Sequence, residues 1–431
     1  MCGICGLVDP NENNHRLITE MTDLLKHRGP ENVGYFHNGN VSLGHRRLAI
    51  IDLETGDQPI YNEDRTVVVI MNGEIYNFPE FKADLIQRGH HFYTNSDTEI
   101  LAHGYEEYGL EFLARLNGIF AFALYDIKNE RLILARDHFG VKPLHYWFQN
   151  EVLLFSSEYK AILVHPAVRR QVNYSALHCQ VNLRYNQSDE TLIKGIYRLP
   201  PASYLIYEKG RMSIKKYYQL PVNLNFKMTE AEAIDGIRFH LQQSVRRQLI
   251  SDVPLGVYLS GGMDSSALVA MMAAEKIRPI NTFTLGFNES TDEFDDAAVI
   301  ARQFNTNHTT TALALEPLQH FPATIWHAEE PKINLLQGFH LSEFVSHSLK
   351  VVLGGLGGDE LFIGYDIYRY LWAMRGLLQN RPGFCQKTLG NSIGSLLFSL
   401  QNSTKILKWD EYRRGLQMLF SAGDLERCYL I

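Results

Sequence analysis

The amino-acid sequence predicts two domains of different class: an α+β domain with packed antiparallel sheets, followed by an α/β domain with a parallel, doubly wound sheet. Three observations lead to this prediction. The chain has 431 residues, which is more than one compact core usually holds. β-rich runs separated by turn residues dominate the first half. Strand-like and helix-like segments alternate in the second half.

The first domain is predicted from four β-rich runs within residues 1–207. Helices are expected to be few, with one inside FKADLIQRGHHFYT at 81–94. A short turn separates the last two runs, which therefore predict a hairpin. The runs are VSLGHRRLAIID at 41–52, TVVVIMNGEIYN at 66–77, IFAFALYD at 119–126 and RLILARD at 131–137.

A polar stretch at 208–230 is interpreted as the linker, because helical periodicity begins directly after it, at 231–250. The segments that follow alternate as in a parallel α/β sheet, where ligands bind beyond the carboxyl ends of the strands. These segments are VPLGVYLS at 253–260 (strand), DSSALVAMMAAEK at 264–276 (helix), INTFTLGF at 280–287 (strand), DDAAVIARQF at 295–304 (helix) and LKVVLGG at 349–355 (strand).

The composition is that of an ordinary globular protein, with 45% hydrophobic and 21% charged residues. A formal net charge of −7 gives no basic surface for nucleic acid. The five cysteines are scattered and odd in number, which argues against a disulfide framework and for a reducing compartment. The first residues lack the features of a signal peptide, and no run approaches the ~20 apolar residues of a membrane span. We therefore expect a cytoplasmic protein without a nucleic-acid or membrane partner.

The first six residues, MCGICG, place Cys2 and Cys5 in a C-x-x-C pair. Removal of Met1 would leave a thiol and a free α-amino group on Cys2. Such an amine has an ordinary pKa of about 7.7 to 8.0, so it could take the proton of the thiol and make Cys2 a nucleophile. A redox pair needs a preceding strand, which residue 2 cannot have. From spacing alone, buried structural cysteines rank first, a nucleophile second and a redox pair third.

Six stretches of the first half favour the nucleophile. They are MCGICG at 1–6, HRGP at 27–30, HRRLAIID at 45–52, NGEIYN at 72–77, SDTE at 96–99 and RDHFGVKPL at 136–144. In this order they resemble the glutamine amidotransferase domain with an N-terminal cysteine nucleophile, and more closely that domain as it occurs in asparagine synthetases. The resemblance covers roughly 200 residues. It implies an N-terminal nucleophile fold for residues 1–207, a catalytic Cys2, and no catalytic role for Cys5, which we expect in the core.

The same resemblance implies a glutamine site with Cys2, Asn72 and Gly73 as catalytic residues. The Asn72 side chain and the Gly73 N–H would stabilise the tetrahedral oxyanion, presented by a tight Asn-Gly turn after the apolar run VVVIM. The α-carboxylate and α-ammonium of glutamine need a bidentate cation and opposing carboxylates. The implied glutamine-binding residues are Arg47, Leu48, Asn72, Gly73, Glu74 and Asp97.

Two of these residues have simpler interpretations when taken alone. Arg47 could be a surface arginine, and Asp97 could be the N-cap of a helix, because SDTE at 96–99 is also a capping-box pattern. The ordered set of motifs favours glutamine binding for both residues.

The stretch YLSGGMDSSALVAMM at 258–272 follows a predicted strand and opens a predicted helix. Gly261 and Gly262 allow close approach of the backbone, and the N–H groups and dipole of the helix favour a bound anion. No lysine follows the glycines, so this is not a GxxxxGK[ST] loop. For SGG alone, a turn with Asp264 as helix N-cap is the simpler interpretation, and the attached D-S-S disfavours it.

S-G-G-x-D-S-S resembles the pyrophosphate loop of ATP pyrophosphatases, which cleave ATP between its α and β phosphates to form an acyl-adenylate. The resemblance implies ATP as substrate and Mg²⁺ as cofactor, since hard carboxylate oxygens suit this ion. The implied metal ligands are Asp264 and Asp359. The implied ATP-binding residues are Tyr258, Ser260, Gly261, Gly262, Asp264, Ser265, Leu285, Gly354 and Gly355.

Two departures from the asparagine synthetase pattern bear on the second half. Leu356 stands in GGLGGDE, where these enzymes usually have a glutamate that takes part in forming and aminating the intermediate. An E-A-R-x-P-F-L-D stretch and a catalytic lysine are missing before residue 431. We therefore expect residues 231–431 to form a synthetase domain that is incomplete at its C-terminus.

The sequence thus predicts a glutamine-dependent amidotransferase, with asparagine, AMP, pyrophosphate and glutamate as expected products. One alternative is the same chemistry on another carboxylic acid, such as a natural-product, peptide or sugar acid. Another is a glutaminase whose second half only binds a nucleotide or a partner protein, and a third is a binding protein on a borrowed fold. The expected partners are small-molecule substrates, and a homodimer is left open.

Overall fold

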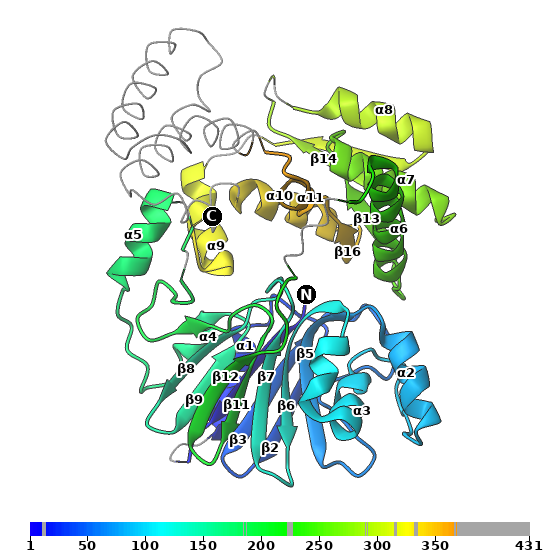
Figure 1. Ribbon diagram of the computed structural model, residues 1–431. Helices are drawn as coiled ribbons and strands as arrows, with labels where there is room; N and C mark the ends of the chain where they lie inside the picture. The colour runs from blue at the N-terminus through cyan, green and yellow to red at the C-terminus, as the bar shows by residue number, and fades with distance from the viewer. Residues whose placement is uncertain are drawn as a thin grey trace, which may run out of the picture. The chain divides into compact units, whose positions relative to one another are not determined.

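The computed structural model describes residues 1–10, 14–183, 185–186, 188–221, 227–288, 290, 292–313, 317–331, 335–365 and 368 (Figure 1). The chain forms two compact units, Met1–Gly354 and Gly355–Ile431. The predicted extent of the second domain to residue 431 therefore runs beyond the described residues, as do Cys385 and Cys428.

The N-terminal part of the first unit contains two six-stranded antiparallel sheets. The first has the strand order β10-β8-β9-β1-β3-β2, and the second has the order β12-β11-β7-β6-β5-β4. The strands of the first sheet are β1 (Gly3–Val8), β2 (Asn32–Asn38), β3 (Val41–Arg47), β8 (His145–Gln149), β9 (Val152–Ser156) and β10 (Tyr197–Arg198). Those of the second are β4 (Ile60–Tyr61), β5 (Val67–Ile75), β6 (Gly118–Asp126), β7 (Arg131–Arg136), β11 (Ser203–Glu208) and β12 (Arg211–Lys216).

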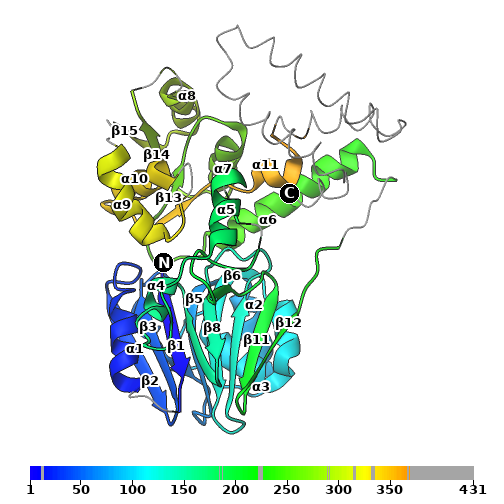
Figure 2. The same cartoon turned by 90° about the vertical axis from the view of Figure 1, so that its left-hand side faces the viewer.

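Helices cover the outer faces of both sheets, which gives the four layers visible in Figure 2. α1 packs on the first sheet, and α2, α3 and η1 share a core with the second. The helices of this part are α1 (Asn14–Asp23), α2 (Phe78–Gln87), α3 (Glu99–Tyr108), the 3-10 helix η1 (Gly109–Arg115), α4 (Tyr159–Ile162) and α5 (Tyr174–Leu183).

The run VVVIM in β5 explains how these layers form. Val68 and Ile70 lie in the core between the two sheets, whereas Val67, Val69 and Met71 lie in the core shared with α2 and α3. A strand that is buried on both faces has apolar side chains at every position instead of every second one. The predicted hairpin is confirmed, because β6 and β7 pair in antiparallel register around residues 127–130. β12 of the second sheet lies within 208–230, the stretch that was interpreted as the linker. The domain boundaries stay a prediction.

The remainder of the first unit contains a parallel four-stranded sheet in the order β15-β14-β13-β16, as predicted for an α/β fold. The core around Val257, Val269 and Ala297 joins β13 to α7 and α8, and α6 adds Val245. The elements are α6 (Glu230–Gln248), β13 (Leu255–Tyr258), α7 (Met263–Ala274), β14 (Asn281–Gly286), α8 (Phe294–Phe304), β15 (Asn307–Ala312), α9 (Pro317–Ala328), α10 (Leu335–Ser346) and β16 (Val351–Leu353).

The strand order reverses between β13 and β16. From β13 the chain proceeds outward through β14 to β15, and then returns to place β16 on the other side of β13. In open parallel sheets, the carboxyl ends of the strands at such a reversal form the ligand-binding crevice. The carboxyl ends of β13 and β16 are therefore the expected ligand site of this sheet.

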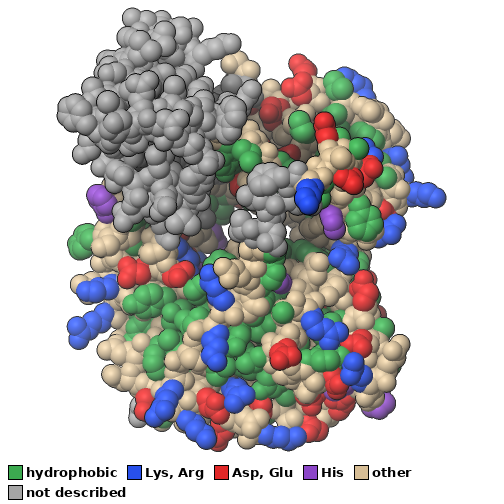
Figure 3. All heavy atoms as spheres, in the orientation of Figure 1, with side chains coloured by type: hydrophobic (Ala, Val, Ile, Leu, Met, Phe, Trp, Pro, Cys, Tyr) green, Lys and Arg blue, Asp and Glu red, His purple; other side chains and the backbone are tan. Residues whose placement is uncertain are grey.

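In the second unit the structure describes 355–365 and residue 368, including α11 (Gly358–Phe362). Within the described residues of the whole chain, no helix has the length and apolar character needed to span a membrane. On the face drawn in Figure 3, acidic and basic side chains are interspersed over the described residues.

Candidate active site

Cys2 lies directly before β1, at the end of the sheet core. β1 pairs with β3 in antiparallel register, with Gly3 opposite Arg46, so Cys2 reaches the residues that follow β3. Its Sγ lies 3.5 Å from the backbone N of Leu48 and 3.7 Å from the Leu48 carbonyl oxygen. Burial raises the pKa of the Cys2 thiol, so a base must assist its ionisation. Cys5 is fully buried beside Thr22, as expected for a core residue.

Two cations near the N-terminus were not assigned a role from the sequence, although both lie in the quoted motifs. Arg28 donates from Nε to the Cys2 carbonyl oxygen at 2.9 Å and forms an ion pair with Glu158. Lys142 is buried, and its Nζ lies 3.3 Å from the Met1 Sδ. Burial lowers the pKa of the Met1 α-ammonium to about 5, so this amine is uncharged at neutral pH.

Asn72 and Gly73 lie inside β5, and the predicted tight Asn-Gly turn is wrong. They pair with Ala121 and Phe120 of β6, and the antiparallel ladder continues to Ile75. The apolar pairing on both faces of β5 outweighs the local turn preference of Asn-Gly. A Cβ on Gly73 would lie 2.3 Å from the Ile119 carbonyl oxygen, so only glycine fits at this close approach of the two strands.

The Asn72 side chain is fully buried, and neither its Nδ2 nor its Oδ1 has a hydrogen-bond partner among the described residues. Leaving a buried amide unsatisfied costs about 1–3 kcal/mol, so such a group indicates a missing ligand. An oxyanion formed on a bound substrate would accept a hydrogen bond from Nδ2.

Arg47 is a buried residue and not a surface arginine. Its Nη1 lies 2.7 Å from Asp57 Oδ1, and its Nη2 donates to the Ile51 and Asp52 carbonyl oxygens. The guanidinium therefore closes the loop at 51–57 next to Leu48. The side chain of Asp57 is more than half exposed. A substrate carboxylate that binds Arg47 would have to share the guanidinium with Asp57 or displace it.

The partly buried Glu74 and the buried Asp97 form a pair of carboxyl groups. Burial raises the pKa of both, and the charge of Asp97 raises that of Glu74 further. Asp97 Oδ2 accepts a hydrogen bond of 2.8 Å from the Ile75 N–H. The capping interpretation of Asp97 does not hold, because Thr98 is the N-cap of α3. The pair is suited to bind an ammonium group, which would take the place of a shared proton.

This pair predicts that the KM for glutamine rises as the pH falls. From the sequence, Glu74 and Asp97 are predicted to bind the α-ammonium of glutamine, and protonation would remove the negative charge that attracts it. Because both pKa values are raised, the effect should begin well above the ordinary carboxyl value of about 4. The measurement is glutaminase kinetics between roughly pH 5 and pH 8, with the fold checked by circular dichroism at each pH. An Asp97→Asn variant should have a high KM at every pH. A KM that stays constant over this range in the unsubstituted enzyme would contradict the assignment.

In the parallel sheet, the loop after β13 is closed by two of the three serines of SGGMDSS, Ser260 and Ser265. The Ser260 N–H and Oγ lie 3.2 and 3.1 Å from the Ser265 Oγ, and the Gly262 N–H donates to the Ser260 Oγ at 3.2 Å. Gly261 has a φ of +80°, which glycine adopts without strain. Gly262 is the N-cap of α7, so Asp264 lies in the first turn of the helix and is not its cap. No side chain caps α7, which leaves its first N–H groups for an anion.

The remaining predicted ATP residues of the first unit lie at strand ends. Tyr258 ends β13, Leu285 is the last but one residue of β14, and Gly354 follows β16 directly. Gly355 and Asp359 belong to the second unit, in which Asp359 lies on α11 and Leu356 is 95% exposed. The assignment of Asp264 and Asp359 as metal ligands stays a prediction.

Family models of known proteins match both halves of the chain. A glutamine amidotransferase domain model matches residues 1–218, and an asparagine synthase model matches residues 236–422. Asparagine synthetase [glutamine-hydrolyzing] 1 of Bacillus subtilis is 34% identical over 383 residues, covering 86% of this chain and 60% of that protein. The asparagine synthetase of Zea mays is 34% identical over 386 residues, covering 85% and 60%.

A third relative carries a different name. Amidase chyE of Penicillium rubens is 33% identical over 413 residues, covering 86% of this chain and 60% of that protein. The chain thus spans about 60% of the length of each of these three relatives.

Proposed function

Since this chain belongs to the family of glutamine-hydrolysing asparagine synthetases, we propose that it is a glutamine-dependent amidotransferase that forms an amide through an acyl-adenylate. The buried side-chain amide of Asn72 in β5 carries the first half of this proposal. Neither of its two polar atoms has a hydrogen-bond partner among the described residues. Removal of Met1 is part of the proposal, because only then does Cys2 carry the α-amine.

In the glutaminase step, the α-amine of Cys2 takes the thiol proton, and the thiolate attacks the side-chain amide carbon of glutamine. The Asn72 Nδ2 and the Gly73 N–H donate to the resulting oxyanion. The amine then returns its proton to the leaving nitrogen, so ammonia departs and a thioester remains, which water hydrolyses to glutamate. The raised pKa of the thiol makes an adjacent base necessary.

Binding of glutamine as a free amino acid needs recognition of both its charged groups. We assign the α-carboxylate to Arg47, beside Leu48, and the α-ammonium to Glu74 and Asp97. Two observations support this assignment: Asp97 is buried, and the Oε2 of the partly buried Glu74 has no hydrogen-bond partner among the described residues.

In the synthetase step, the N–H groups at the start of α7 and the Ser260 and Ser265 hydroxyls would hold the pyrophosphate of ATP. The carboxylate of the acceptor attacks the α-phosphorus and displaces pyrophosphate, and ammonia then displaces AMP from the acyl-adenylate. Position at the strand reversal of the sheet and an uncapped helix N-terminus support this assignment. Asp264 and Asp359 carry the oxygen ligands that Mg²⁺ prefers, and the bound ion would neutralise phosphate charge.

Aspartate is the proposed acceptor, so the proposed products are asparagine, glutamate, AMP and pyrophosphate. Leu356 favours a second candidate, in which another carboxylic acid takes the place of aspartate. Its side chain neither moves a proton nor binds a metal, in a loop where a glutamate is usual for aspartate-using relatives. The likeness to a protein named as an amidase points in the same direction.

Product analysis tests the proposal. The purified protein is incubated with glutamine, ATP, Mg²⁺ and aspartate, and in parallel with a panel of other carboxylic acids. We expect glutamate, AMP and pyrophosphate together with asparagine, and mass analysis of the intact chain should show that Met1 is absent. Pyrophosphate formed only with another acid would favour the second candidate. ADP in place of AMP, or glutamate formation without any use of ATP, would contradict the synthetase step.

A further inference from the structure

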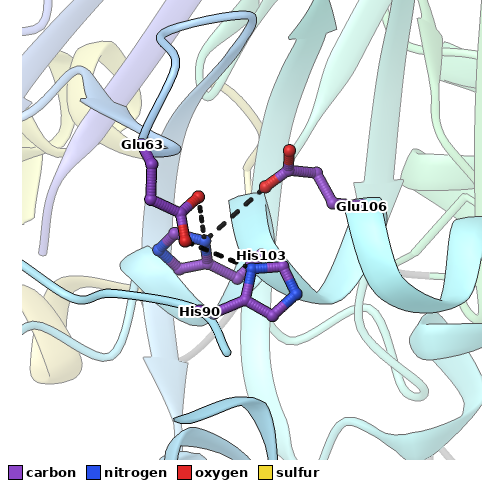
Figure 4. Close-up of side chains that lie close together, drawn as sticks. All are labelled: Glu63, His90, His103 and Glu106. Carbon is purple, nitrogen blue, oxygen red and sulfur yellow. Dashed lines mark ion pairs between the residues drawn. The ribbon is translucent and has the colours of Figure 1, made fainter. Parts of the chain in front are cut away.

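A cluster of imidazole and carboxylate groups lies in the N-terminal part (Figure 4). None of its members was assigned to glutamine binding. One of its members follows β4, one follows α2, and two lie on the same face of α3 at positions i and i+3. One ligand atom from each of the four lies within 4.8 Å of the ligand atoms of the others. The members of this His/Glu cluster are Glu63, His90, His103 and Glu106.

The distances within the His/Glu cluster match those between ligands of one small cation. The His103 Nδ1 lies 3.2 Å from the Glu63 Oε2 and 3.6 Å from the Glu106 Oε2, and the His90 Nδ1 lies 3.3 Å from the Glu63 Oε1. In a tetrahedral zinc site with bonds of about 2.0 to 2.1 Å, neighbouring ligand atoms are roughly 3.3 Å apart.

His103 gives a second, independent indication of a ligand. Its side chain is fully buried, and its Nδ1, which points to the centre of the cluster, has no hydrogen-bond partner of good geometry among the described residues. Its other ring nitrogen, Nε2, lies 3.4 Å from the Glu99 carboxylate. A ligating histidine is usually oriented in this way, by a carboxylate on the nitrogen that does not bind the metal.

The groups around the cluster are themselves held in place. Glu99 is buried and accepts hydrogen bonds from the Tyr93 and Thr94 N–H groups at 2.9 and 2.8 Å. The Glu106 Oε1 accepts one from the Asn62 Nδ2 at 2.7 Å, which turns Oε2 toward His103. Supporting contacts of this kind distinguish a built site from a chance gathering of surface charges.

Of the cluster members, His90 lines a hollow of about 310 Å³ at the surface. The side chains of Glu63, His90 and Glu106 are partly exposed, at 34%, 15% and 28%. An ion can therefore enter from solvent and meet His103 at the buried end of the cluster.

We propose that the His/Glu cluster is a structural binding site for one Zn²⁺ ion. Two imidazole nitrogens and two carboxylate oxygens complete four-coordination, which is the usual arrangement of a structural zinc site, and this donor set is too nitrogen-rich for Mg²⁺ or Ca²⁺. The ion joins the middle and the C-terminal half of α3 to the turn before β5 and to the loop after α2. The site is independent of the proposed amidotransferase activity.

The competing occupant of the cluster is a proton. Burial lowers the pKa of His103, but the carboxylates of Glu106, Glu99 and Glu63 outweigh burial and raise it to about 9. Without metal, an imidazolium can therefore satisfy the same carboxylates, and zinc binding must release that proton. A test must distinguish these two states.

Zinc binding to the full chain tests the proposal directly. All samples carry Cys2→Ala, so that the thiol does not bind the ion, and are freed of metal with a chelator. Titration with Zn²⁺ in competition with a chromophoric chelator should give one ion per chain. The melting temperature should rise with added Zn²⁺. Co²⁺ should produce the visible absorption of a tetrahedral site.

Three variants assign the site. His90→Asn and Glu106→Gln change partly exposed side chains, so the fold should survive, and each should weaken Zn²⁺ binding by about 10- to 100-fold or more. His91→Asn is the matched control, because His91 lines the same hollow without belonging to the cluster, and it should leave binding unchanged. The proposal is overturned if the parent protein takes up no Zn²⁺ in competition. Equal binding by His90→Asn and the parent would also overturn it, and would leave the cluster as an ion-pair network around protonated His103.

Discussion

Replacing Cys2 with alanine is expected to reduce glutamine hydrolysis by roughly 10⁴-fold or more, because the thioester can no longer form. The same variant should retain ATP-dependent amide formation when ammonia is supplied directly. Ammonia enters the second reaction in the same form, whatever its source. Both rates are measured on one preparation, as glutamate release and as pyrophosphate release.

The matched control for this prediction is Cys179→Ala. Cys179 is a partly buried free cysteine on α5, so its loss should leave both rates unchanged. Glutamate release by Cys2→Ala at the rate of the parent would show that another group attacks glutamine. Loss of both reactions together would show that the two halves do not act in sequence through ammonia.

The catalytic and binding residues of the first half were predicted from short motifs. Cys2, Asn72 and Asp97 were assigned from the order of six stretches, and their roles stay predictions. The conformation of Asn72-Gly73 was not predictable from local sequence. Asn-Gly is a strong hairpin signal, but the ladder between β5 and β6 runs through it, with Gly73 opposite Phe120. Tertiary pairing decided the outcome, as it often does for strands.

The supporting residues were less predictable than the motifs themselves. Arg28 and Lys142 stood in quoted stretches, yet only the structure shows that they approach the main chain of Cys2 and the side chain of Met1. The His/Glu cluster had no sequence signal beyond His103 and Glu106 on one helix face. Its other two members come from separate loops, and only the packing of α3 against β4 and β5 brings them together.

In the second half, the close approach of the backbone in the glycine-rich loop was predicted from its glycines, because glycine adopts backbone conformations that other residues avoid. Gly261 has a left-handed backbone conformation, and a small residue is required there for a second reason as well. A Cβ at this position would lie 2.6 Å from the carbonyl carbon of Asp296 and 2.7 Å from the backbone N of Ala297, at the start of α8. The sequence pattern does not reveal this contact.

Gly261→Ala is therefore expected to lower ATP-dependent pyrophosphate release by about 10²-fold, since a shift of about 1 Å in a group that positions substrate costs that much. The left-handed backbone adds a strain of about 1–2 kcal/mol for alanine. Because the loop cannot keep its place against α8, the Ser260 and Ser265 hydroxyls lose their alignment with the phosphates. Glutamine hydrolysis at Cys2 should stay at the level of the parent protein.

Gly236→Ala provides the control, because Gly236 lies inside α6 and a Cβ there meets no atom within 4 Å. Alanine favours a helix interior by up to about 1 kcal/mol over glycine, so this variant should be as stable as the parent or more so, with unchanged pyrophosphate release. The two variants add the same methyl group to the same half of the chain, and only one adds it where the proposed phosphate loop has no room. Full pyrophosphate release by Gly261→Ala would mean that ATP does not bind at the SGGMDSS loop.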